Sequence, residues 1–356
     1  MKIGILTFQW AINRNFGASL QSYACMTLLK KFYKEVKIID FYKQSSKSSI
    51  KMKIQSSLES KYFKEYNQKF LPLTSKIENF EGLKKLNNEF DTFVVGSDQV
   101  WRGIWNLDSK THYFFDFVND DKKKISYAAS FGVDYWEGDK KLTEEIKPLI
   151  KRFNYISVRE ESGIDICKNT FGVDDAICVL DPTLMVSRED YQPILDDWTD
   201  KSHLNKKYIA HMLLDDTEEL KNESEKIGKY LDANINYIKG KVKKIFWKKY
   251  FGYNKVSQWL TYLKDAELVI TDSFHCTVFS IIFHKKFVVV ANTMRGVARL
   301  ETLLEKVGLQ DRFFIDIKDV MKSGILDKEI NYDEVEKKLA VHRKYSMDFL
   351  KKALED

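Results

Sequence analysis

Several motifs that would mark common chemistries are absent from this sequence. The four cysteines, Cys25, Cys167, Cys178 and Cys276, include no CxxC pair, which argues against a zinc site or a disulfide framework. No GxGxxG, GxxxxGK[ST] or GxSxG segment occurs, which weakens the dinucleotide-cofactor, P-loop and α/β-hydrolase interpretations. The six histidines form no HExxH pair, and no two aspartates are separated by a single residue, as in metal-dependent sugar transferases. We therefore expect neither a metal ion nor a cofactor.

Long apolar segments and a strongly basic character are also absent. No run approaches the ~20 apolar residues of a membrane span, and residues 2–8 read as a strand without the longer apolar core of a signal peptide. A net charge of +6 is modest for this length, and no zinc-finger, homeodomain or RRM signature occurs. We expect a cytoplasmic protein that does not bind nucleic acid and that can still touch a membrane surface.

The length of the chain and its alternating pattern predict two α/β domains. A chain of 356 residues exceeds what one core usually organises. Buried strands are predicted at 3–7, 36–40, 90–95, 124–129, 155–158 and 176–180, then at 208–213, 235–238, 268–271 and 287–290, with helical stretches between them. We predict an N-terminal domain over 1–182, a C-terminal domain over 183–330, and a helix within 331–356 that packs on a domain surface.

Residues 42–69 interrupt this alternation. The segment holds seven lysines against two glutamates and is rich in serine. We interpret it as an insertion that is mobile or partly helical. A solvated surface segment is the simpler interpretation, and a basic flap over an acidic substrate or an anionic lipid is the other.

The segment LVITDSFHCTVFSIIF, residues 268–283, places His275 where a buried strand ends and a helix begins. Ligands of open α/β sheets collect at the carboxyl ends of strands. A helix N-terminus also offers free N–H groups and a positive dipole end to an anion. We therefore expect His275 to exchange a proton with a bound anion and Ser273 to line the same turn. The other five histidines are interpreted as structural or surface residues.

Three further turns follow predicted strands or open a helix. Ser97, Asp98 and Gln99 follow a short apolar strand and suit sugar hydroxyls, although an ordinary helix cap would use the same residue types. Arg159 directly follows the strand at 155–158, where its fork of donors fits a carboxylate or phosphate; a surface ion pair with Glu160 or Glu161 is the alternative. Asn15 and Gly17 belong to a turn that opens a helix.

Two arginines lie just after the strand at 287–290. Arg295 and Arg299 are expected at the strand-end crevice, or else as solvated charges near a helix start. The helix dipole disfavours cations at a helix N-terminus, so arginines placed there favour a bound anion.

The ordered motifs resemble those of the polysaccharide pyruvyl transferase family. They are NFGASLQSYA at 15–24, VVGSDQVW at 94–101, SYAASFG at 126–132, ISVREESG at 156–163, LDPTL at 180–184 and TDSFHCTVFSIIF at 271–283. The resemblance implies two Rossmann-like domains with a cleft between them, as in GT-B glycosyltransferases. It also implies transfer of the pyruvyl group of phosphoenolpyruvate to sugar hydroxyls. Cys276 stands where the family usually has glycine.

The resemblance further implies roles for individual residues. Arg159 and His275 match family positions associated with phosphoenolpyruvate, so Arg159, with Arg295 or Arg299, would hold the donor. His275 would supply a proton, and Asp98 is the weaker candidate for a general base. The implied acceptor is a polymeric or lipid-linked glycan of capsule, exopolysaccharide or cell-wall synthesis, at the inner face of the membrane. Two alternatives remain open: a nucleotide-sugar glycosyltransferase of the same fold, and a non-catalytic, membrane-peripheral scaffold.

Overall fold

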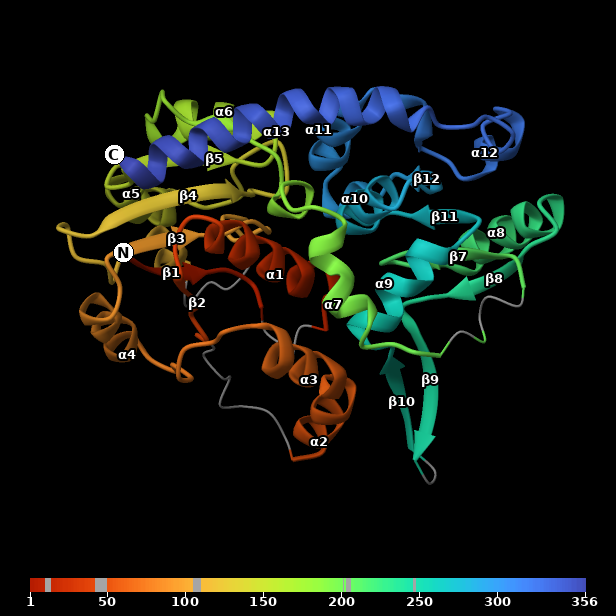
Figure 1. Ribbon diagram of the computed structural model, residues 1–356, viewed down its shortest axis with the longest axis horizontal. Coiled ribbons are helices and arrows are strands. Elements are labelled where there is room, and N and C mark those ends of the chain that lie inside the picture. The colour runs from red at the N-terminus through yellow and green to blue at the C-terminus, as the bar shows by residue number, and fades with distance from the viewer. Residues whose placement is uncertain (10–13, 42–49, 105–109, 201, 203–205, 246–247) are drawn as a thin grey trace.

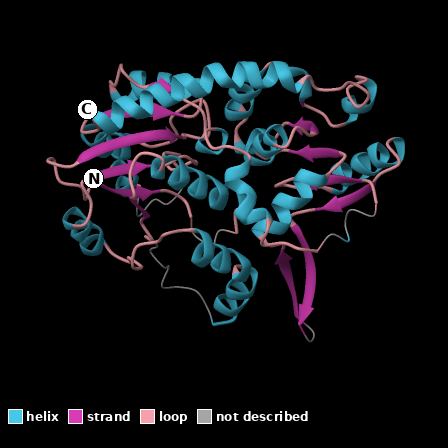
Figure 2. Ribbon diagram, in the orientation of Figure 1, coloured by secondary structure: helices cyan, strands magenta, loops and turns pink. Residues whose placement is uncertain are grey.

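The computed structural model describes residues 1–9, 14–41, 50–104, 110–200, 202, 206–245 and 248–356. Two sheets lie side by side within them, each with helices packed against it, and a long C-terminal helix crosses both (Figure 1, Figure 2). The predicted α/β class with two Rossmann-like units is confirmed by this arrangement of parallel strands.

The N-terminal sheet has six parallel strands within the described residues, in the order β2-β1-β3-β4-β5-β6. The strands are β1 (Lys2–Leu6), β2 (Glu35–Ile38), β3 (Thr92–Val95), β4 (Lys123–Ala129), β5 (Tyr155–Val158) and β6 (Ile177–Cys178). All run in the same direction, so their carboxyl ends share one edge. That edge carries the turns after β3 and β5 in which the sequence predicts site residues.

The C-terminal sheet has five parallel strands in the described part of the chain, in the order β13-β12-β11-β7-β8. They are β7 (Tyr208–Met212), β8 (Asn234–Tyr237), β11 (Leu268–Thr271), β12 (Lys286–Val290) and β13 (Phe313–Phe314). An antiparallel pair outside this sheet, β9 (Gly240–Ile245) and β10 (Lys248–Tyr253), forms a hairpin that the sequence did not predict.

The central strands of each sheet, such as β3, β7 and β11, are buried on both faces, which explains why they are largely apolar. On β3, Val94 belongs to one core cluster, while its neighbours Phe93 and Val95 belong to another on the opposite face. The cluster containing Val94 also contains Val269 of β11, so one continuous core extends from the first sheet to the second. The two domains are therefore held together by shared apolar packing.

Helices cover these faces and connect the strands. In the N-terminal half they are α1 (Phe16–Lys30), α2 (Ile50–Glu59), α3 (Lys61–Phe70), α4 (Phe80–Lys85), α5 (Lys140–Ile150) and α6 (Glu161–Ile166). The remaining helices are α7 (Gln192–Leu195), α8 (Glu218–Tyr230), α9 (Val256–Asp265), α10 (Phe274–Ile282), α11 (Ala298–Val307), α12 (Lys318–Lys322) and α13 (Tyr332–Glu355). None of the described helices is both long and apolar enough to cross a bilayer.

The described part of the Lys-rich insertion is helical. Residues 42–49 lie outside the described residues, and α2 and α3 make up the rest. On α3 the Phe63 ring packs against Phe16 at 5.0 Å, and the Tyr66 hydroxyl donates to the Ser19 carbonyl at 3.3 Å. The insertion is therefore docked on α1 through its apolar face and leaves Lys61, Lys64 and Lys69 exposed.

The C-terminal helix α13 spans both domains, whereas the sequence predicted packing on one domain's surface. Near its start, Tyr332 donates to the Lys285 carbonyl of the second domain at 2.5 Å. Near its end, the Ser346 hydroxyl accepts from the Leu180 N–H of the first domain, and Phe349 packs against Tyr155. With 24 residues the helix is long enough to reach across both sheets.

Candidate active site

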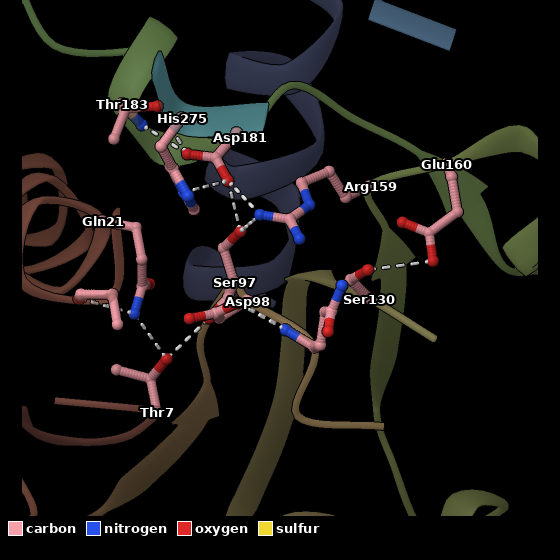
Figure 3. Close-up of polar contacts among 12 residues, drawn as sticks. Thr7, Gln21, Ser97, Asp98, Ser130, Arg159, Glu160, Asp181, Thr183 and His275 are labelled. Atoms are coloured by element: carbon pink, nitrogen blue, oxygen red, sulfur yellow. Dashed lines mark hydrogen bonds and ion pairs between the residues drawn. The ribbon is translucent and has the colours of Figure 1, made fainter. Parts of the chain in front are cut away.

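One buried carboxylate collects the side chains that the sequence singled out. Asp181 follows β6, and its Oδ2 accepts from Arg159 Nη1 at 2.8 Å and from Ser97 Oγ at 2.5 Å (Figure 3). His275 Nε2 lies 3.6 Å from the same oxygen. The other oxygen, Oδ1, accepts from the N–H and hydroxyl of Thr183. Arg159 and Ser97 from the first domain thus meet His275 from the second around a single group.

The surroundings keep Asp181 ionised. Burial alone would raise its pKa, but His275, Arg159 and Ser97 together hold the pKa well below the ordinary value for aspartate. A permanent negative charge at this position stabilises the buried guanidinium of Arg159. The carboxylate also aligns the side of the His275 ring that carries Nε2.

His275 lies in the first turn of α10 and faces the first turn of α1 across the domain boundary. A Cβ atom on Gly17 would lie 2.2 Å from His275 Nδ1, so only glycine permits this approach. Asn15 caps α1 by accepting from the Ala18 N–H at 3.1 Å, which fixes where the helix begins. The predicted Asn15–Gly17 turn and His275 are therefore neighbours in the structure.

The guanidinium of Arg159 has donor capacity left over. Its Nη1 is used by Asp181 and Ser97, but Nε and Nη2 are buried and have no hydrogen-bond partner among the described residues. The plane of the group lies 4.4 Å from the Phe274 ring centroid. Glu160 and Glu161, the alternative ion-pair partners expected for Arg159, have other partners. Glu160 accepts from the Phe131 N–H, and Glu161 pairs with Lys306. Buried unpaired donors of a permanent cation favour an anionic ligand.

Arg299 of α11 brings a second guanidinium to the same region. Burial, and then the positive charge of Arg159, lower the pKa of Arg299 to about 10. With the Gln99 amide oxygen turned toward it, Gln99 accepts from both terminal nitrogens of Arg299 at 2.6 and 2.8 Å. Arg299 Nε is buried without a partner among the described residues. Two guanidinium groups that repel one another are stabilised together when an anion lies between them.

Asp98 stands in a strained conformation beside this pair. Its φ of 96° lies in the left-handed region, which is unusual for a residue with a side chain. Oδ1 accepts from the Gln99 N–H at 2.8 Å, while Oδ2 is buried without a partner in the described structure. A carboxylate oxygen held in this way is able to accept a hydrogen bond from a ligand hydroxyl.

Arg295 is directed elsewhere. Its Nε and Nη2 donate to the two oxygens of Asp215 at 2.6 and 2.9 Å, so its fork is occupied within the second domain. Asn292 continues this network by donating to Asp215 and to Asp272. Of the two arginines proposed from the sequence for the donor, the structure brings only Arg299 to Arg159.

The turn that opens α10 leaves backbone donors available. Ser273 occupies the N-cap position without making a capping hydrogen bond through its side chain. The first N–H groups of the helix therefore lack that partner, as an anion-binding helix end requires. Cys276 is fully buried in the core, and burial raises the pKa of its thiol to about 12. The thiol therefore stays protonated.

Asp181 is the site residue that the sequence analysis did not assign. It appeared only within the LDPTL motif and as the end of a predicted strand. A local signal was present, because an aspartate before Pro182 and Thr183 is a typical cap, and Asp181 does accept from the Thr183 N–H. Its contacts with Arg159 and His275 depend on strand order and domain docking, which no local pattern encodes.

The arrangement suits the chemistry of an anionic substrate and proton transfer. Arg159, Arg299 and the start of α10 supply positive charge, and His275 supplies a group that can carry a proton. In the described part of the chain, no three His, Cys, Asp or Glu side chains gather closely enough to hold a metal ion. The candidate site is built from two guanidinium groups, one imidazole, the carboxylates of Asp181 and Asp98, and hydrogen-bonding groups.

Solved structures with the same fold are nucleotide-sugar enzymes and related proteins. UDP-GlcNAc 2-epimerase from Neisseria meningitidis is 10% identical with a TM-score of 0.55, over 99% of this chain and 100% of the other. The Methanocaldococcus jannaschii UDP-GlcNAc 2-epimerase is 16% identical with a TM-score of 0.50, over 96% and 99%. Anabaena HepE, solved with UDP, is 9% identical with a TM-score of 0.52, over 100% and 99%. These likenesses establish the GT-B-like fold alone.

The sequence comparison adds the family. No curated protein is similar enough in sequence to contribute. The sequence profile described as polysaccharide pyruvyl transferase matches residues 15–293, a range that includes Gly17, Ser97, Arg159, Asp181 and His275. The chain therefore belongs to the polysaccharide pyruvyl transferase family.

Proposed function

We propose that the protein transfers the pyruvyl group of phosphoenolpyruvate to two hydroxyls of a sugar and forms a cyclic ketal. The observation that carries this proposal is the pair of unpartnered, buried donors on Arg159, next to Arg299 and His275. Phosphoenolpyruvate has a carboxylate and a phosphate in a small molecule, which matches two guanidinium groups and a helix N-terminus. The acceptor is proposed to be a glycan of polysaccharide synthesis.

The proposed reaction begins with protonation of the donor. His275 donates a proton to the methylene carbon of phosphoenolpyruvate, and the adjacent carbon becomes cationic and is attacked by a sugar hydroxyl. The hydroxyl proton passes to a base, for which Asp98 is the candidate. Phosphate then leaves with the electron pair of its C–O bond and takes the proton held by Asp98. A second hydroxyl of the same sugar adds to the resulting cationic carbon and closes the ketal, and its proton returns to His275. The products are the ketal and inorganic phosphate.

Each cation has a defined task in this scheme. Arg159 and Arg299 hold the donor's negative groups and stabilise the departing phosphate. Asp181 keeps Arg159 and His275 in place from behind, because its oxygens are already used by protein donors. Gln99 and Ser273 are proposed to contact substrate from the rims of the two domains. No cofactor takes part.

The cellular setting is also a proposal. A phosphoenolpyruvate donor is a cytosolic metabolite class, and a lipid-linked or polymeric acceptor would bring the enzyme to the inner face of the membrane. We propose a cytoplasmic enzyme with peripheral membrane contact, acting in capsule, exopolysaccharide or cell-wall glycan synthesis.

The test separates this donor from a nucleotide sugar. Wild-type protein should be stabilised against heat by phosphoenolpyruvate and not by UDP-GlcNAc, because only ligands of the native state raise the melting temperature. Candidate glycans incubated with 13C-labelled phosphoenolpyruvate should gain a labelled pyruvyl group, read by mass spectrometry. Stabilisation by UDP-GlcNAc alone would favour a nucleotide-sugar glycosyltransferase, the function suggested by the shared fold.

Matched histidine variants sharpen that test. His275→Ala should lose phosphate release by about 10³-fold or more, since proton transfer by a positioned side chain typically contributes 10²–10⁴-fold. His284→Ala is the control, because His284 is exposed and pairs with Glu336 away from Asp181. Near-normal turnover of His275→Ala would exclude the assigned proton donor.

A further inference from the structure

The β9–β10 hairpin differs in charge from the rest of the chain. Residues 239–255 contain seven lysines and no aspartate or glutamate, although the protein as a whole has 58 basic and 52 acidic residues. The hairpin is antiparallel, with Lys241 opposite Gly252 and Lys243 opposite Tyr250, and it projects beyond the second domain (Figure 1). A projecting ribbon with charge of one sign is exposed to partners and is not part of the core.

Three ammonium groups gather around one tyrosine beside the hairpin. Lys61, Lys243 and Lys255 place their Nζ atoms 5.8, 6.0 and 5.8 Å from the Tyr62 ring centroid. They come from α3, β9 and the residue that precedes α9. Cations from three elements converge here, so positive potential accumulates on the surface that the insertion shares with the hairpin.

Nearby carboxylates neutralise only part of this charge. Glu65 lies 3.9 Å from Lys61, and Asp197 is taken by Lys69 and by the Ser257 hydroxyl. A surface hollow of about 210 Å³ opens between these groups and is also lined by Tyr62 and Lys255. For Lys241 and Lys243, the described residues show no acidic partner. A net positive surface therefore remains.

Apolar groups are interleaved with the lysines. Val242, between Lys241 and Lys243, is 63% exposed. The stem of Lys243 lies over Gly252, where an added Cβ would approach its Cδ to 2.4 Å. Phe251 and Tyr253 pack edge to face at 4.7 Å along the second strand. Lysines mixed with an exposed aliphatic side chain and half-buried aromatic rings are typical of surfaces at a lipid–water interface.

We propose that Lys61, Tyr62, Lys241, Val242, Lys243 and Lys255 form a docking surface for an anionic lipid bilayer. Lysines near such a bilayer are attracted by its negative surface potential, and exposed apolar groups enter the headgroup region. Free phosphate or a soluble polyanion would explain the lysines but not the exposed Val242 between them. These six residues are the docking surface.

The docking surface lies close to the candidate active site. Tyr253 at the base of the hairpin is 6.4 Å from the Phe16 ring and 5.8 Å from the Arg14 guanidinium. Phe16 precedes Gly17, whose Cα faces His275. If the proposed function holds, a bilayer bound here would bring lipid-linked sugars to the side of the protein where α1 and α10 meet. Bilayer binding itself does not depend on that function.

Vesicle binding by the full-length protein tests the proposal without donor or acceptor. Vesicles of phosphatidylcholine with 30 mol% phosphatidylglycerol should bind the wild type in 0.1 M NaCl, and pure phosphatidylcholine vesicles should not. Each lysine near an anionic surface contributes about fivefold in affinity, so Lys241→Glu with Lys243→Glu should weaken binding by about 30-fold or more. Binding should also fall steeply by 0.5 M NaCl, where exposed charges are screened.

Two further variants keep the result interpretable. Lys140→Glu with Lys141→Glu makes the same change in net charge at exposed positions on α5 and should bind like the wild type. Val242→Glu alters one exposed side chain and should weaken binding while the melting temperature stays unchanged. Because Lys243 packs on Gly252, the melting temperature of the double variant is measured alongside.

Several results would overturn the proposal. These are equal binding to neutral and anionic vesicles, unchanged binding of both hairpin variants, or equal losses in the hairpin and α5 variants. Stronger binding to a short nucleic-acid duplex than to anionic vesicles at the same salt would also overturn it. Turnover of a soluble glycan by the hairpin variants should remain normal, so failure of the docking proposal is distinguishable from failure of the proposed function.

Discussion

Two clusters of the same residue types, one between the domains and one within the second domain, have different properties. In the first, Arg159 pairs with Asp181, and His275 lies 3.6 Å from that aspartate. In the second, Arg295 pairs with Asp215, and His211 lies 3.8 Å from the adjacent Asp216. Each arginine follows a strand of a parallel sheet. Position in the sequence alone therefore makes both arginines candidates for binding an anionic ligand.

Burial and spare donors separate the clusters. The Arg159 and Asp181 side chains are 1% and 0% exposed, and Arg159 keeps two unpartnered nitrogens. The Arg295 and Asp215 side chains are 37% and 52% exposed, and the aspartate takes both ends of the guanidinium fork. When an exposed guanidinium already donates both ends of its fork to a carboxylate, it has few donors left for a ligand. A buried arginine with free donors is the better anion site.

The arginine comparison predicts the largest difference. Arg159→Lys should reduce phosphate release from phosphoenolpyruvate by about 10³-fold, because an ammonium group replaces neither the planar fork nor its unpartnered donors. Arg295→Lys should change turnover by less than about fivefold, since an exposed pair of this kind contributes little. Steady-state rates of phosphate release by both variants test this prediction. Equal losses would mean that the second cluster also contacts the donor.

The second-largest predicted difference concerns how much each aspartate, Asp181 and Asp215, contributes to the stability of the fold. Asp181→Asn leaves the guanidinium of Arg159 buried without its counter-charge and should lower the free energy of unfolding by about 3–5 kcal/mol. Asp215→Asn removes half of an exposed pair and should cost less than about 1 kcal/mol. Urea unfolding at pH 7 measures both. A small effect of Asp181→Asn would show that Arg159 is not held by that charge.

Much of the fold was predictable because apolar runs mark strands. The bounds of β5 and β11 match the predicted 155–158 and 268–271 at both ends. The β9–β10 hairpin was missed, because its lysines and aromatic residues neither alternate regularly nor form an apolar run. Local sequence patterns also could not predict that α13 crosses both domains. Such packing depends on how the two sheets dock.

The site was predictable in part for the same reason. Strand-end positions indicated that Ser97 and Arg159 would share one edge of the first sheet, and the expected cleft between the domains placed His275 opposite them. Sequence position could not distinguish Arg295, which precedes α11, from Arg299 within it, and the two contact different partners. Asp181 was missed because its role depends on contacts between distant strands. The catalytic roles assigned to these residues stay predictions until tested.

The histidine comparison gives the smallest predicted effect, a pH dependence specific to the second cluster. The His211 side chain is 1% exposed, its ring packs on Tyr237 at 4.8 Å, and its Nε2 has no hydrogen-bond partner among the described residues. Burial, with a smaller contribution from Lys221, lowers the pKa of His211 to about 4. Asp216 faces the ring, and its own pKa is raised, first by its burial.

The direction of that effect follows from proton linkage. Between pH 6.5 and 4 the unfolded chain binds a proton at His211 that the folded protein excludes, so stability falls as the pH is lowered through this range. A difference of about 2.5 pKa units corresponds to roughly 3 kcal/mol, which is fully lost only near pH 4. His211→Phe keeps the aromatic contact with Tyr237 and removes the titration, so its unfolding free energy should fall less between pH 6.5 and 5. Parallel urea titrations of wild type and His211→Phe across that interval provide the measurement. Identical slopes would mean that folding does not lower the pKa of His211.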